Sequence, residues 1–350
     1  MTRMRKKQIQ CLLSLGVSVF LLGGLFSSIP VTRAVYHGVF DRQFETAEVI
    51  DQDPADFKME RTESSFYSFG DRLSGFLYRG GEGEAQGLFV FAHGFGNASH
   101  RTYLPLFEAL CERGFLVFAY DGAGVEDSEG AKGPRGLPRG VMDLESAVLH
   151  ALGLPEAEGL PLILGGHSWG AYAAGCALSL FPECKGALLF AGFNRSEDML
   201  LHSAKKYAGP LAYLGYPFIR AYEEGQFPAP YAELSAVEGI KAASCPVLVV
   251  GAEEDETVPR EVGFDLFREA LAENERVTLL LRRGRDHKNL FYSDGAMAYR
   301  ESLRQKWKAE GEGESFEAYF ASAPDRQLGF GMDEDLVKEM VRMLKNGEGF

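Results

Sequence analysis

A serine with the potential for nucleophilic chemistry lies at the junction of two different sequence patterns. Ser168 stands in GGHSWG, after the apolar run LPLIL and before the small-residue run AYAAG. The glycines at positions 166 and 170 complete a G-x-S-x-G pattern, which is typical of a tight strand-to-helix turn that exposes the serine hydroxyl. A serine with only a structural role in a turn would fit the same pattern, so the reactive interpretation depends on partners elsewhere in the chain.

A serine hydroxyl becomes a good nucleophile only when a base lies within hydrogen-bonding reach. Among the seven histidines, His287 in RRGRDHKNL follows the last predicted strand directly, which makes it the best candidate for this base. His167 lies inside the turn, where its side chain is expected to point away from Ser168. His93 is expected to shape a neighbouring loop.

The imidazole of such a base needs a carboxylate that fixes its tautomer and stabilises its charged form. The segment GAEEDETVP ends a predicted strand and offers several acids, of which Asp255 stands where the following turn begins. Glu254 is the main alternative. The three residues then occur in the order Ser168, Asp255 and His287.

Negative charge that develops on a carbonyl oxygen requires donors that are already in position. The backbone N–H of Trp169 follows the serine at the start of a predicted helix. The second donor is expected in HGFG (93–96), the loop after the first parallel strand, and Phe95 N–H is the candidate.

These residues require a sheet that brings several strand ends together. A hairpin is predicted where SSFYSF and RLSGFLYRG flank Gly70 and Asp71. After it, short apolar runs alternate with helices, which predicts an α/β fold with a mostly parallel central sheet and helices on both faces. The predicted strands are 87–94, 115–121, 161–168, 186–192, 246–255 and 276–284, and the helices lie near 101–112, 140–152, 169–181, 260–273 and after residue 290.

The sequence divides into four parts. Residues 1–34 are expected to be a membrane anchor or signal segment, 35–57 a linker without clear periodicity, and 58–350 the catalytic domain. Residues 194–245, rich in Tyr, Phe and Pro, are too long for a simple connection and predict a small helical lid. An ordinary connection with a surface helix is the alternative.

The first 34 residues resemble a membrane-targeting segment. Arg3, Arg5, Lys6 and Lys7 precede an uncharged stretch at 9–29, which as a helix would reach about 30 Å and cross a bilayer. The positive-inside rule then predicts a cytoplasmic N-terminus and an extracytoplasmic catalytic domain. A signal peptide cleaved near Thr32 and Ala34, which would release a secreted protein, is the alternative.

Composition excludes some partners. The formal net charge of −14 leaves no basic surface for a nucleic-acid backbone, so nucleic acid is not expected to bind. The five cysteines lack metal-like spacing, so they are expected to be buried thiols. Neither a metal ion nor another cofactor is expected.

The motifs together resemble a known family. HGFGNASHRTYLPLFEALCERGFLVFAYDGAG, GGHSWG, GAEEDETVP and RDH make residues 60–345 similar to α/β-hydrolases of the serine-aminopeptidase-like and monoacylglycerol-lipase-like group. The resemblance implies a catalytic triad of Ser168, Asp255 and His287 and oxyanion donors at Phe95 and Trp169. The segment DGAGVEDS matches the family pattern only loosely, and the lid offers no clear match.

The expected function is therefore that of a serine hydrolase that cleaves carboxylic esters or related acyl bonds through an acyl-enzyme. Its expected substrate is a small acyl compound with an apolar or aromatic group, although the lid aromatics could serve packing alone. A peptidase is the nearest alternative, with Glu197, Asp198, Glu223 and Glu224 as acids that could hold a substrate ammonium group. A non-catalytic binding protein with a hydrolase fold is the second alternative.

Overall fold

The computed structural model describes residue 30 and residues 33–81, 83–310 and 315–345. Its strands are β1 (Glu60–Ser68), β2 (Asp71–Arg79), β3 (Gly87–Ala92), β4 (Phe115–Tyr120), β5 (Leu162–His167), β6 (Gly186–Phe190), β7 (Val247–Ala252) and β8 (Val277–Arg282). Its α-helices are α2 (Leu104–Cys111), α3 (Arg139–Leu152), α4 (Trp169–Ala177), α5 (Ser196–Ala208), α6 (Ala212–Gln226), α7 (Ala236–Ala242), α8 (Phe264–Ala270), α9 (Asp294–Glu310), α10 (Phe316–Ala321) and α11 (Glu334–Lys345). A further helix covers residues 33–40.

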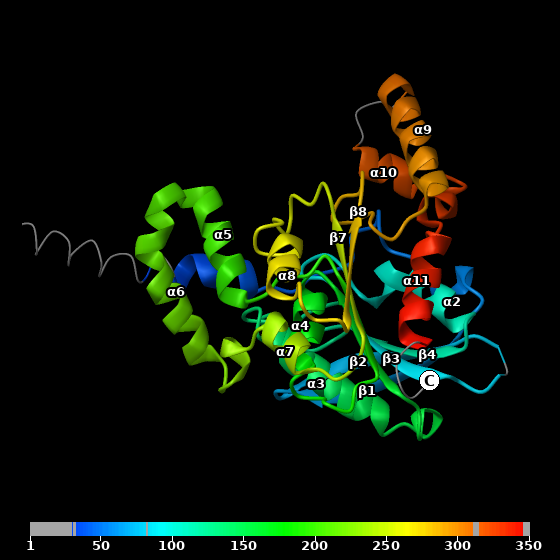
Figure 1. The fold of residues 1–350 in the computed structure, drawn as a ribbon. Coiled ribbons are helices and arrows are strands. Elements are labelled where there is room, and N and C mark those ends of the chain that lie inside the picture. The colour runs from blue at the N-terminus through cyan, green and yellow to red at the C-terminus, as the bar shows by residue number, and fades with distance from the viewer. Residues whose placement is uncertain (1–29, 31–32, 82, 311–314, 346–350) are drawn as a thin grey trace, which may run out of the picture.

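The described strands form one sheet in the order β1-β2-β4-β3-β5-β6-β7-β8 (Figure 1). β1 and β2 form the predicted antiparallel hairpin, and β2 pairs antiparallel with β4. The neighbours from β4 to β8 run parallel. The predicted α/β fold with a mostly parallel sheet is confirmed, because strands buried on both faces leave continuous apolar runs in the sequence.

Helices cover both faces of the sheet. Leu88 and Val90 of β3 pack into the core under α3, α4, α7 and α8, whereas Phe89 and Phe91 pack into the core under α2 and α11. This alternation follows from the two-residue period of a strand. Because neighbouring strands from β4 to β8 are parallel, they all end at one edge of the sheet. The loops at that edge carry the candidate site.

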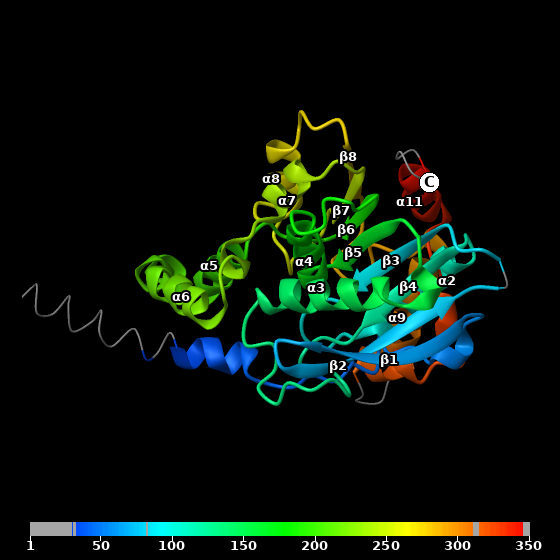
Figure 2. The same ribbon diagram turned by 90° about the horizontal axis from the view of Figure 1, so that it is seen from below.

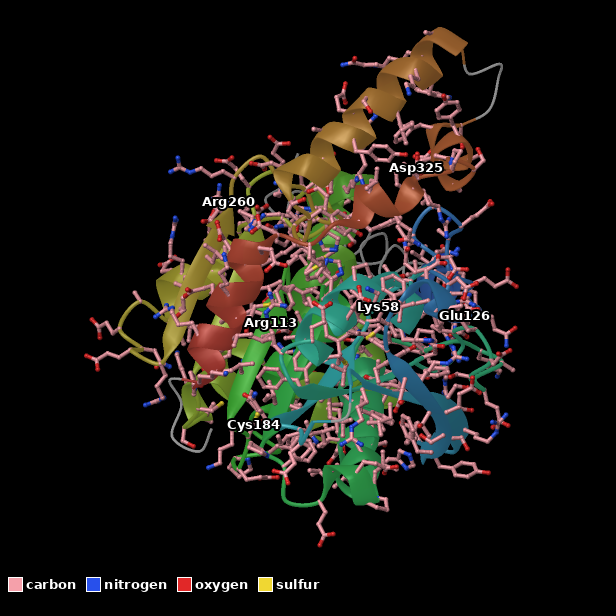
Figure 3. The ribbon with its side chains drawn as sticks, turned by 90° about the vertical axis from the view of Figure 1, so that its right-hand side faces the viewer. Lys58, Arg113, Glu126, Cys184, Arg260 and Asp325 are labelled. Atoms are coloured by element: carbon pink, nitrogen blue, oxygen red, sulfur yellow. The ribbon has the colours of Figure 1, made fainter. Side chains whose placement is uncertain are left out.

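An ion pair joins α2 and α11, two helices on the second face of the sheet. Arg113, which follows α2, donates to Glu334 at the start of α11, with 2.6 Å between nitrogen and oxygen. Figure 3 shows α11 beside the labelled Arg113. The helices expected after residue 290 are α9, α10 and α11.

The segment between β6 and β7 has two different parts. α5 and α6 form a hairpin that projects from the body of the molecule (Figure 1). α7, in contrast, packs closely on α4, where a Cβ added to Gly239 would lie 2.1 Å from the carbonyl oxygen of Gly175. The part of the expected lid that lies outside the helix layers is therefore the α5–α6 hairpin, and α7 belongs to the body.

Residues 33–47, which include the first part of the expected linker (35–57), pack against the body and the α5–α6 hairpin (Figure 2). We call this segment the strap. Tyr36, Phe40 and Phe44 are each at most 4% exposed. The backbone of Phe44 pairs with Gly124 and Glu126, and Ala47 N–H donates to Asn97. The linker prediction was wrong here because these aromatic side chains find an apolar surface on the folded domain.

The transmembrane helix expected over residues 9–29 lies outside the described residues. Among the helices that are described, none has the length and apolar composition that crossing a membrane requires.

Candidate active site

Ser168 occupies a strained turn between β5 and α4. Its backbone has φ 56° and ψ −116°, a region that residues with a side chain rarely adopt. Its N–H donates to Phe190 O at 2.8 Å, which ties the turn to the neighbouring β6. Such a turn lifts the serine side chain away from both the strand and the helix.

The two glycines around Ser168 are required by the close approach of the backbone. A Cβ added to Gly166 would lie 2.3 Å from the carbonyl group of Gly170. A Cβ added to Gly170 would lie 2.0 Å from the carbonyl oxygen of Ala92, at the end of β3. The G-x-S-x-G pattern is therefore explained by sterics at both glycines.

His287 and Asp255 meet beside this turn. His287 Nδ1 lies 2.7 Å from Asp255 Oδ2, and both side chains are buried. The other oxygen, Asp255 Oδ1, accepts from the N–H groups of Thr257 and Val258 at 2.9 and 2.8 Å. The carboxylate is thus fixed by its own turn and holds one nitrogen of the imidazole.

The candidate residues follow the ends of four different strands. Ser168 follows β5, Asp255 follows β7, His287 follows β8 and Phe95 follows β3. Parallel strands carry all four to the same edge, which is where ligands bind in sheets of this type. Glu254, the alternative to Asp255, is exposed to solvent, and its backbone N–H donates to Arg285 O.

His167 joins the serine turn to the loop that carries His287. Its Nε2 lies 2.8 Å from the backbone oxygen of His287, which can only accept, so Nε2 carries the proton. Burial holds the pKa of His167 well below its usual value, so the ring is neutral. Nδ1 then accepts from the hydroxyl of Tyr103 at 2.9 Å, and that oxygen accepts from Gly94 N–H at 3.1 Å.

His93 fixes the loop that contains Phe95. Its Nδ1 donates to Gly94 O at 2.7 Å, and its Nε2 accepts from Gly122 N–H at 2.9 Å. Burial lowers the pKa of His93, in agreement with a neutral ring that donates at one nitrogen and accepts at the other. Both ring nitrogens are occupied by backbone groups, so His93 acts as a support for the loop.

Comparison with known proteins identifies similar sequences. Residues 83–228 match the family described as serine aminopeptidase, S33. The chain is 30% identical over 165 residues to the monoglyceride lipase of Saccharomyces cerevisiae, and 26% identical over 189 residues to the lysophosphatidylserine lipase ABHD12 of Danio rerio. These alignments cover 45% and 51% of this chain, and the chain spans about half the length of these curated relatives, 51% and 46%.

A solved esterase from Pyrococcus furiosus shows the same fold. It superposes with a TM-score of 0.54 at 19% identity, covering 78% of this chain and 96% of the esterase. The chain therefore has the α/β-hydrolase fold. The resemblance expected from the sequence motifs is confirmed.

The side chains of the two candidate oxyanion donors touch each other. The rings of Phe95 and Trp169 meet edge to face with 5.6 Å between their centroids. Trp169 is the first residue of α4, and the first N–H groups of a helix have no partner within the helix. Its indole Nε1 donates to Leu137 O at 2.7 Å, which fixes the ring away from that backbone N–H.

The strap also packs against Phe95, a contact that the sequence did not predict. The rings of Phe40 and Phe44 lie 5.5 and 5.1 Å from the ring of Phe95. Thr46 contacts Ser99 and Glu126, of which Glu126 is labelled in Figure 3. The four-residue spacing of Tyr36, Phe40 and Phe44 is the signal that could have revealed a buried face.

Three of the four acids considered for a substrate ammonium group already have partners. Glu197 and Glu224 both pair with Arg220, at 3.2 and 2.7 Å. Glu223 is buried and accepts hydrogen bonds from Tyr36 and Ser196. Across the described residues, no group of three or more His, Cys, Asp or Glu side chains is arranged to hold a metal ion.

Proposed function

We propose that this α/β-hydrolase cleaves carboxylic esters by a serine mechanism, with Ser168 as nucleophile, His287 as base and Asp255 as its orienting acid. The observation that carries the proposal is the 2.7 Å contact between His287 Nδ1 and Asp255 Oδ2. It lies at the same sheet edge as the strained turn of Ser168. A fixed, buried imidazole with one nitrogen on a carboxylate leaves the other nitrogen for proton transfer.

The mechanism has two halves. Ser168 Oγ attacks the ester carbonyl while His287 Nε2 accepts the hydroxyl proton, and Asp255 stabilises the imidazolium. The N–H groups of Phe95 and Trp169 bind the developing oxyanion. The imidazolium returns its proton to the departing alcohol, which leaves an acyl-enzyme. Water, activated by the same histidine, then attacks the acyl-enzyme and releases the acid with Ser168 restored.

The proposed substrate is an ester with an apolar acyl or aryl group. The aromatic rings of Phe95 and Trp169 pack together close to Ser168. The ring of Phe40 in the strap packs against Phe95. Two relatives are named for lipid esters, a monoglyceride lipase and a lysophosphatidylserine lipase. Monoglycerides and lysophosphatidylserine are therefore the first natural substrates to test.

Active-site labelling tests the proposal directly. The wild-type protein should react with a fluorophosphonate probe at Ser168 and hydrolyse p-nitrophenyl esters, and Ser168→Ala should do neither. Ser179→Ala, a hydroxyl that donates to Cys176 O just after α4, serves as the matched control. A wild-type protein left unlabelled at Ser168 would show that the fold has only a binding role.

The same assay separates esterase from peptidase activity. Ester turnover should exceed turnover of aminoacyl anilides, because the α5–α6 hairpin acids Glu197, Glu223 and Glu224 already have partners. Anilide turnover equal to ester turnover would favour an aminopeptidase.

We also propose that residues 9–29 anchor the protein in a membrane, with the hydrolase domain on the extracytoplasmic side. The support is the basic cluster before an uncharged stretch of sufficient length. The protein should remain with the membrane fraction after a high-salt wash. Protease added outside intact cells should reach the hydrolase domain, and release of a shortened soluble form would indicate signal cleavage.

A further inference from the structure

The α5–α6 hairpin has a buried carboxylate that the proposed mechanism does not use. Within α6, the buried residues are Ala212 and Glu223, and the side chain of Glu223 is nearly inaccessible to solvent. An ionisable group is not placed in such a position for apolar packing. Because burial of a carboxylate is costly without hydrogen bonds, its partners define what Glu223 does.

Glu223 connects three separate segments. Oε1 accepts from the hydroxyl of Tyr36 in the strap at 2.9 Å, and Oε2 accepts from the hydroxyl of Ser196 in α5 at 2.5 Å. The Tyr36 hydroxyl that Glu223 binds lies against Gly136, which is part of the body of the hydrolase just before α3. The carboxylate therefore joins the hairpin to the strap and to the body of the hydrolase.

Leu137, the residue after Gly136, contacts the candidate oxyanion donor Trp169. Its carbonyl oxygen accepts from Trp169 Nε1 at 2.7 Å. The preceding Gly136 leaves no space for a side chain, because an added Cβ would lie 2.2 Å from the hydroxyl oxygen of Tyr36. The Gly136 and Leu137 backbone is thus held between the strap, α6 and the tryptophan.

We propose that Glu223 is a positioning residue for oxyanion stabilisation: it holds Tyr36 against the backbone of Gly136 and Leu137, and Leu137 in turn holds Trp169. The inference rests on the proposed serine hydrolase function. It adds a regulatory contact, since the same carboxylate also fixes Tyr36 of the strap, whose Phe40 packs on Phe95.

The surroundings of Glu223 favour its neutral form. Burial is the main cause that raises its pKa to about 7, and the charge of Glu197 on α5 adds to the effect. Tyr36 from the strap and Tyr172 from α4 are the other titratable groups that interact with it. Across the described residues no Lys, Arg or His forms an ion pair with Glu223. Its protonation state therefore changes near neutral pH, where ionisation carries the cost of burying a charge although the Tyr36 and Ser196 hydroxyls donate more strongly to the ionised form.

Steady-state kinetics with p-nitrophenyl esters test the positioning role on the full-length protein. Glu223→Ala should lower kcat by at least about 10-fold with little change in KM, because a donor displaced by less than 1 Å stabilises the transition state poorly. Glu224→Gln, the neighbouring exposed acid, should stay close to wild type. Wild-type kcat in a folded Glu223→Ala protein would overturn the proposal.

Tryptophan fluorescence provides a readout that does not depend on turnover. Trp307→Phe leaves Trp169 as the sole tryptophan, since the chain has two. Its emission should show a transition near pH 7 that Glu223→Gln removes. Tyr36→Phe should move the midpoint to higher pH, because the lost hydrogen bond stabilised the ionised form.

The outcomes separate the two proposals. A transition that persists in Glu223→Gln, or that is absent from the Trp307→Phe parent, overturns the positioning role even if the enzyme hydrolyses esters. Failure of fluorophosphonate labelling in the wild type overturns the serine mechanism itself. If Glu223→Gln does not fold, the Tyr36→Phe midpoint decides, and an unshifted midpoint counts against Glu223.

Discussion

The rings of His167 and His287 lie 4.7 Å apart between centroids, and His167 donates to the backbone oxygen of His287. The residue before the proposed nucleophile therefore holds the loop of the proposed base. His167→Ala should leave that oxygen without its donor and the proton of the Tyr103 hydroxyl without its acceptor, at a cost of about 1–3 kcal/mol in unfolding free energy. It should also lower kcat. His202→Ala, a half-buried histidine on α5, is the control, and equal effects of the two substitutions would contradict the prediction.

Asp255 should matter far more than its acidic neighbour. Asp255→Asn keeps the shape of the side chain but removes the charge that stabilises the imidazolium, which in the serine-protease template costs about 10⁴ in kcat. Glu254→Gln should stay within about twofold of wild type, because Glu254 is exposed. Ester hydrolysis by the two purified variants checks this, and a larger loss in Glu254→Gln would reassign the acid.

The same substitution should have opposite effects at two glycines. Gly170→Ala places a Cβ 2.0 Å from Ala92 O, so it should prevent correct folding of the serine turn or remove activity. Gly225 lies in α6 with no atom near an added Cβ, so Gly225→Ala should stabilise the helix by about 0.5–1 kcal/mol. Thermal unfolding with activity measurements compares them, and an active, stable Gly170→Ala would show that the strand ends can separate.

A buried ion pair should dominate the stability of the region behind the site. Asp143 accepts from Arg139 Nε at 2.6 Å and also from Ser68 and Ala123, and both charged side chains are 1% exposed. Asp143→Ala leaves the buried Arg139 with Asp71, at 3.0 Å, as its remaining carboxylate and should cost about 3 kcal/mol. Asp335→Ala breaks an exposed pair with Lys338 and should cost less than about 1 kcal/mol. Urea unfolding measures both, and equal costs would contradict this view.

Glu223 should also make stability depend on pH. Its pKa is raised from 4.5 to about 7 by burial, so the folded state binds this proton more tightly than the unfolded state. The stabilisation is fully present below about pH 4.5 and is lost as the pH rises through 7, a change of about 3 kcal/mol. Between pH 4.5 and 8, wild type should therefore lose more unfolding free energy than Glu223→Gln. Parallel losses would argue against a buried carboxylate.

The sequence was sufficient to predict the candidate site residues that follow the ends of strands. Ser168, Asp255 and His287 could be proposed together because each follows an apolar run, and parallel strands bring such positions to one edge. The contact between His287 and Asp255 agrees with that reasoning. The catalytic roles of these residues stay predictions.

Other parts depend on contacts that a linear reading does not show. Glu223 and Glu224 look alike in the sequence, yet only Glu223 reaches Tyr36, which lies 187 residues away. The strap was predicted to be a linker because no single periodic pattern covers it. Its aromatic residues, spaced four apart, continue beyond the end of its helix. The sequence prediction placed α7 in the lid because it relied on the length of the connection. That length does not show which helix of the connection packs on the body.

The strap has a practical consequence for recombinant production of the hydrolase. A shortened chain that begins at Lys58, where the sequence pattern places the domain boundary, would lack Tyr36, Phe40 and Phe44. The ring of Phe95, which Phe40 and Phe44 cover, would then become part of an apolar surface open to solvent. Such a truncated protein should aggregate, whereas one that begins just before residue 33 should remain dispersed, and light scattering of the two would distinguish them.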